Sequence, residues 1–136
     1  MIELDYKKDK ELFNKTAQKW AEKIFEDKEY IEKEKRGRVE KNFKKEPIKT
    51  TQMRKFYEQI LERYNEVKIE KKAFDDVLPF IKMINSKVEY AYSRELVNKS
   101  FRKMMTTSIE QIEDETKLEN FKLFFEAVIG FYKGSK

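Results

Sequence analysis

Histidine and cysteine are both absent from this chain of 136 residues. Without an imidazole there is no histidine general base, and without a thiol there is no cysteine nucleophile. The same absences remove the usual zinc ligands and any disulfide framework. We therefore expect no metal, no cofactor and no catalytic site of these classes.

Glycine and proline are scarce, with three and two copies. Glycines at 37, 130 and 134 cannot build a GxxxxGK[ST] or GxGxxG phosphate loop, so nucleotide hydrolysis is not expected. Asp75 and Asp76 are adjacent and would point about 100° apart on a helix, so they are expected to be exposed first-turn acids. Scarce helix breakers favour long helices over short strands. The sequence predicts a non-enzymatic all-α protein.

Long apolar runs are also missing. The densest, Phe121 to Tyr132, is interrupted by Lys122 and Glu126, and the N-terminus shows no apolar signal segment. We expect a cytoplasmic protein with no membrane segment. Apolar residues make up 39% and aromatic residues 14% of the chain, enough for one core despite 42% charged residues. The prediction is a single domain over residues 1–136.

Apolar spacing predicts a compact bundle of about five helical segments. The first is expected from Asp9 to about Lys35, the second from Thr50 or Thr51, and the third from about Lys72. In the third, Pro79 either occupies the first turn of a new helix or kinks a continuous one. The last helix should begin with a capping box formed by Thr116 and Glu119. Aromatic residues on these stripes are assigned to one core: Trp20, Phe56, Tyr57, Phe121 and Phe125.

The apolar stripe changes direction near Ser93. Residues up to Tyr92 keep one face apolar, but the next apolar residues lie more than a right angle around the helix. Either the chain turns at Ser93, or one long helix continues, and no glycine or proline between residues 80 and 129 decides between them. A continuous helix would leave a patch exposed for pairing with a second copy, and we predict a homodimer on that basis. The patch comprises Val97, Phe101, Met104 and Met105.

Positive charge is concentrated in a connector at residues 33–49, which holds eight basic and three acidic residues and so accounts for the net charge of +5. Gly37 and Pro47 favour an irregular loop there. Such a segment is either a solvated connector or a contact for a polyanion. From charge alone, the candidate contacts are Arg36, Arg38, Lys41, Lys44 and Lys45.

A second candidate site lies on the helix around residue 90. Lys87 and Arg94 are seven residues apart, so they share a helix face about 10 Å apart, with Tyr90 beside them. Cations at this spacing can contact separate phosphates, and the tyrosine can stack on a base. Arg54 and Lys55 flank the Met53 stripe in a similar way. The alternative is that Tyr90 lies at the core rim and these cations are ordinary exposed helix charges.

Four stretches resemble one family, the small subunit of type III-A CRISPR effector complexes. They are KTAQKWAEKI at 15–24, TTQMRKFYEQI at 50–60, SKVEYAYSRE at 86–95 and FKLFFEAVIGFYKGSK at 121–136. Ser93 departs from the family's glycine before the arginine. The resemblance implies a helical, non-catalytic subunit, present in several copies beside the other subunits, that contacts guide and target RNA. Residues matching the family pattern are Gln52, Arg54, Lys55, Lys87, Tyr90 and Arg94.

The sequence therefore predicts an RNA-binding structural subunit that contacts phosphates without reading sequence, because guide and target pairing supplies the specificity. One alternative is a helical protein adaptor without RNA affinity. The other is a metal-dependent nuclease, for which no carboxylate cluster can be assembled from the pattern.

Overall fold

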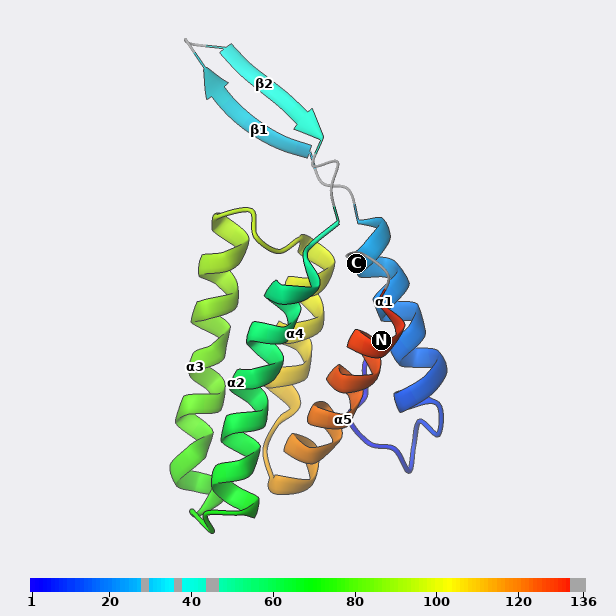
Figure 1. The fold of residues 1–136 in the computed structure, drawn as a ribbon, viewed down its shortest axis with the longest axis vertical. Helices are drawn as coiled ribbons and strands as arrows, with labels where there is room; N and C mark the ends of the chain where they lie inside the picture. The colour runs from blue at the N-terminus through cyan, green and yellow to red at the C-terminus, as the bar shows by residue number, and fades with distance from the viewer. Residues whose placement is uncertain (28–29, 36–37, 44–46, 133–136) are drawn as a thin grey trace.

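Five α-helices form most of the structure, a computed structural model that describes residues 1–27, 30–35, 38–43 and 47–132. They are α1 (Ala17–Glu26), α2 (Thr50–Lys68), α3 (Phe74–Ser93), α4 (Lys99–Gln111) and α5 (Glu115–Phe131). The predicted helical bundle is confirmed (Figure 1). Among the described residues, no helix is long and apolar enough to cross a membrane.

The helices share one cluster of buried side chains. α5 packs against α1 and α2, and α3 packs against α2 and α4. Phe101 of α4 lies at the centre, with ring centroids 5.5 Å from Phe56 and 6.1 Å from Phe125. Trp20 and Phe121 are also buried, as predicted. Tyr57 is only half-buried and packs edge-on against Phe125 at 5.8 Å, so it lies at the core rim.

The first helix is shorter than predicted. A π-helical turn, η1 (Leu12–Thr16), precedes α1, and Asp9 stabilises this start by accepting hydrogen bonds from Glu11 N (3.0 Å) and Thr16 Oγ1 (2.7 Å). The predicted end at Lys35 is wrong, because Asp27 adopts an extended backbone that ends α1. Its carboxylate accepts a hydrogen bond from Ser100 N at 2.8 Å, which ties the end of α1 to α4.

The basic connector contains a β-hairpin, so the prediction of an irregular loop is wrong for the described part of the connector. Strands β1 (Tyr30–Lys35) and β2 (Arg38–Phe43) are antiparallel, with Tyr30 opposite Phe43 and Lys35 opposite Arg38. Pairing satisfies the backbone donors and acceptors that an irregular segment leaves to water. The hairpin extends beyond one end of the bundle (Figure 1).

The chain turns after Ser93, which resolves the change of stripe direction. Leu96 N donates to Ala91 O (2.9 Å) and Glu95 N donates to Tyr92 O (3.0 Å), the two bonds of a Schellman motif. Glu95 takes the left-handed conformation with φ of 62°. The prediction of an exposed self-association patch is therefore wrong. The fold buries all four predicted residues in the core of the monomer: Val97, Phe101, Met104 and Met105.

Helix starts differ in detail from the prediction. α2 begins at Thr50 after Lys49, so neither Thr50 nor Thr51 is its N-cap. The prediction of a capping box formed by Thr116 and Glu119 is also wrong. Asp114 caps α5 instead, by accepting a hydrogen bond from Lys117 N at 2.8 Å. Pro79 lies inside α3, which is one continuous helix from Phe74.

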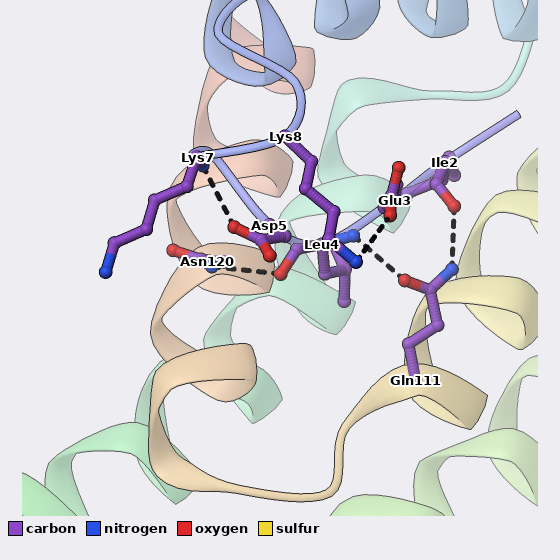
Figure 2. Close-up of polar contacts among 8 residues, drawn as sticks. All are labelled: Ile2, Glu3, Leu4, Asp5, Lys7, Lys8, Gln111 and Asn120. Atoms are coloured by element: carbon purple, nitrogen blue, oxygen red, sulfur yellow. Dashed lines mark hydrogen bonds and ion pairs between the residues drawn. The ribbon is translucent and has the colours of Figure 1, made fainter.

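The N-terminal segment is fastened to the bundle by two side-chain amides (Figure 2). Gln111 accepts a hydrogen bond from Leu4 N (2.9 Å) and donates to Ile2 O (2.7 Å). Asn120 donates to Leu4 O at 2.9 Å. Because Ile2 and Leu4 are buried, these bonds satisfy backbone groups that have lost contact with water.

Candidate nucleic-acid interface

α3 carries an outer stripe about 100° around the helix from its buried stripe. We define the outer stripe as Phe80, Met83, Lys87, Tyr90 and Arg94, which alternate three and four residues apart and so share one helix face. Tyr90 is 62% exposed, so the alternative interpretation, in which Tyr90 lies at the rim of the core, is wrong. The Arg94 guanidinium lies 5.7 Å from the centroid of the Tyr90 ring. The stripe offers a flat aromatic surface beside two exposed cations.

α2 and α3 form a shallow groove along this stripe. Its volume is only about 60 Å³, and it is lined by Gln59, Glu62 and Arg63 of α2 and by Phe80, Met83, Ile84 and Lys87 of α3. A hollow this small is far below the 300–1,000 Å³ of ordinary ligand pockets. The groove is therefore too small to enclose a ligand, and any contact there is made at its surface.

Lys55 lies on the side of α2 that carries this groove. It lies one helical turn before Gln59, so it is on the shoulder of α2 that faces Lys87. α2 and α3 are antiparallel, which brings the beginning of α2 and the end of α3 to the same end of the bundle (Figure 1). Arg54 is exposed but lies about 100° around α2 from Lys55, so it points away from the groove. Helical position thus puts Lys55 on the groove side of α2 and leaves Arg54 apart.

Ion pairing separates these cations from others on the same helices. Lys68 lies 3.1 Å from Glu115, and Arg63 Nε lies 2.9 Å from Glu66. The hydrogen bond that Lys68 donates to Glu115 raises the pKa of Lys68. Lys55 and Lys87 have no ion pair within the described ranges. Their charge is therefore available to an external anion.

The connector residues are only partly described. Arg38 and Lys41 lie in β2. Arg36, Lys44 and Lys45 fall outside the described residues. All five remain candidate contacts on the basis of their charge.

Acidic residues in the described ranges form no metal centre. No group of three or more Asp or Glu side chains there could hold a metal ion. Asp75 and Asp76 are exposed in the first turn of α3, as predicted. A larger hollow of about 410 Å³ lies between α1 and α5, but Glu22 and Glu26 line it. These two carboxylates make the hollow unfavourable for a polyanion.

Gln59 is a groove residue that sequence reasoning missed. Its side chain is half-buried, and its carbonyl oxygen has no hydrogen-bond partner. The sequence could have indicated Gln59, because it lies one helical turn after Lys55 and borders the apolar stripe of its helix. Gln52, seven residues earlier, lies on the same shoulder and is also half-buried.

Comparison with known proteins identifies the family. No curated protein and no solved structure matches the chain. A family model described as Csm2 Type III-A matches residues 27–136, about four-fifths of the sequence. The matched range includes α2 to α5 and the whole α2–α3 groove, whereas α1 and the N-terminal segment precede it. The chain therefore belongs to the Csm2 family, the small, structural subunit of type III-A CRISPR effector complexes.

Proposed function

We propose that this subunit binds the RNA backbone of its effector complex through the α2–α3 groove. Lys55, Lys87 and Arg94 contact phosphates, and Tyr90 stacks on a base or hydrogen-bonds a phosphate oxygen. The observation that carries the proposal is that Lys55 and Lys87 lack carboxylate partners among the described residues, whereas Arg63 and Lys68 of α2 are paired. An unpaired cation beside an exposed aromatic ring is the usual composition of a single-strand binding surface.

The contact should not depend on RNA sequence. The proposed contacts are two lysines, an arginine and a ring face, groups suited to phosphate contact and stacking. In an RNA-guided complex, pairing between guide and target already supplies the specificity. Affinity should then come mainly from counterion release and fall steeply with salt.

Binding of labelled RNA to the full chain across a salt series tests this proposal. Lys87→Ala and Arg94→Ala should each reduce the slope of log affinity against log salt by roughly one unit or slightly less. The matched control is Lys15→Ala, an exposed lysine of η1 without an ion pair among the described residues. Parent-like slopes in both variants would overturn the assignment. Absence of salt-sensitive RNA binding by the parent would instead support a protein adaptor.

We also propose that the subunit does not cut RNA. The family is a structural one, and the sequence lacks histidine and cysteine. Labelled RNA should stay intact during incubation with the purified chain and Mg²⁺ or Mn²⁺. Metal-dependent cleavage that persists through purification and is abolished by Asp75→Asn or Asp76→Asn would contradict this.

Self-association remains a prediction without an assigned surface, because the patch on which it was based is buried. Light scattering during size exclusion across a hundredfold concentration range measures it directly.

A further inference from the structure

A second basic surface lies on α4, outside every residue assigned above. Its centre is an open hollow of about 270 Å³, lined by Glu89, Lys99, Arg102, Lys103, Thr106 and Thr107. Lys99 and Lys103 are exposed and four residues apart, so they lie on one face of the helix. Neither has an ion-pair partner in the described part of the chain.

Arg102 is fixed at the edge of this hollow. Its Nε lies 2.7 Å from Glu89 Oε1, and its guanidinium lies 4.6 Å from the centroid of the Tyr92 ring. The hydrogen bond that Arg102 donates to Glu89 raises the pKa of Arg102. Because the guanidinium compensates Glu89, the acid on the rim does not cancel the charge of the two lysines. The remaining guanidinium N–H groups are held in a defined position.

The groups that face the hollow are mainly hydrogen-bond donors. Two ammonium groups, one guanidinium and the Thr107 hydroxyl can all donate, and Thr107 makes no hydrogen bond within the described ranges. Phosphate oxygens only accept, so this donor set matches a phosphodiester backbone. The hollow is open, which favours a chain passing across it over an enclosed small ligand.

The hollow lies on a different flank of α3 from the α2–α3 groove. Glu89 lines the hollow and Lys87 lines the groove, and residues two apart on a helix point in nearly opposite directions. α3 ends at Ser93 and α4 begins at Lys99, so the end of α3 and the beginning of α4 lie at the same end of the bundle (Figure 1). An RNA strand on one surface would reach the other by passing around the end of α3.

We propose that Lys99, Arg102 and Lys103 form a second RNA-phosphate site that extends the contact from the α2–α3 groove onto α4. This inference rests on the proposed RNA-binding function. It assigns binding to a helix face that carries no part of the family resemblance noted in the sequence.

The test compares two double variants that remove the same charge at the same spacing. Lys99→Ala/Lys103→Ala should lower the salt slope for a 30-nucleotide RNA by about 1.4 units, at about 0.7 per single-strand phosphate. Lys15→Ala/Lys19→Ala, also exposed and four residues apart, should leave the slope unchanged. Lys99→Arg/Lys103→Arg should restore the parent slope. A slope for the alanine pair equal to that of the control pair, with an unchanged melting temperature, overturns the proposal.

Three further outcomes separate the two proposals. A lowered slope in Lys87→Ala/Arg94→Ala together with a parent-like slope in Lys99→Ala/Lys103→Ala refutes the α4 site alone. A parent chain without salt-sensitive RNA binding refutes both. Binding of poly-glutamate, but not RNA, that depends on Lys99 and Lys103 would assign the surface to an acidic protein segment and overturn the proposal. If both sites hold one RNA, the slope losses of the two alanine pairs should add in the quadruple variant.

Discussion

The two faces of α3 differ in how their side chains are satisfied. Ile81, Ile84 and Val88 on one face are at most 2% exposed and fill the core. On the outer stripe, Tyr90 is 62% exposed and Lys87 has no ion pair among the described residues. This difference indicates that residues needed for stability and residues proposed for RNA binding lie on different faces of one helix. Substitutions in the core should lower stability, and substitutions on the outer stripe should change RNA binding alone.

Among the core substitutions, Phe101→Ala in α4 should cause the largest loss of stability. Phe101 is fully buried between Phe56 and Phe125, so its removal leaves a cavity and should lower the free energy of unfolding by roughly 3–5 kcal/mol. Chemical denaturation measures this loss. If Phe101 instead belonged to a subunit interface, the variant would change its mass in light scattering with little loss of monomer stability.

Asn98→Ala should have the next largest effect. Asn98 caps α4 by accepting a hydrogen bond from Phe101 N at 2.9 Å, and it donates to Ile24 O at 2.8 Å. Truncation removes the cap and leaves a buried carbonyl of α1 without a partner, a loss of about 2–3 kcal/mol. Asp114→Ala removes only an exposed cap and should cost about 1 kcal/mol. Equal losses in the two variants would show that the contact with Ile24 contributes nothing.

The helices follow from the sequence because burial sets the apolar period. Met53, Phe56 and Ile60 mark α2 without any knowledge of its neighbours, and all three are buried. Helix ends are harder, since Asp114 and Thr116 are both good caps and only the fold selects between them. The hairpin was missed because Gly37 was interpreted as a loop. Two strand-length runs separated by two residues, one of them glycine, are also a hairpin signal.

The turn after Ser93 shows a different limit of sequence reasoning. Glu95 takes a positive φ that normally selects glycine, at a cost of about 1 kcal/mol or more. Burial of Val97 and Phe101 offsets this cost, because a straight helix would leave both side chains in water. Local propensity could not predict the turn, since its driving force is contact with α1 and α5.

The candidate site was partly predictable for the same reason. Helical spacing alone places Lys87, Tyr90 and Arg94 on one face. It does not say which face of α2 is adjacent, so Lys55 and Arg54 were treated alike although only Lys55 lies on the groove side. The α4 lysines went unnoticed because charges on the polar face of an amphipathic helix carry no signal until the neighbouring helix is known.

Tyr132→Phe tests how the stability of the core depends on pH. The Tyr132 hydroxyl is buried and donates to Ile48 O at 2.6 Å, so the variant should lose about 1 kcal/mol at neutral pH. Burial raises the pKa of Tyr132 to about 12, from 10.0. Between these values the unfolded chain releases its proton before the folded chain does, so the parent loses stability as pH rises from about 10 to 12.

The variant should lose less stability over that range, because phenylalanine does not titrate. Tyr57 retains its own dependence, since burial and Glu126 raise its pKa to about 12 as well. Denaturation series at pH 8, 10 and 11 compare the parent with the variant. Parallel losses in the two proteins would show that Tyr132 is ionised equally readily in the folded and unfolded chains.

Arg94→Ala should have the smallest effect on stability, and it tests the binding side of the comparison most directly. The interaction that holds this guanidinium is an exposed cation–π contact with Tyr90, worth about 0.5 kcal/mol. Thermal unfolding should therefore shift little, while the salt slope of RNA binding falls. Arg94 also lies at the end of α3, where its backbone N–H donates to Tyr90 O at 3.1 Å, and alanine keeps that bond. A variant that binds RNA like the parent but unfolds at a much lower temperature would make Arg94 a structural residue of the turn, and the separation between the two faces of α3 would fail at that position.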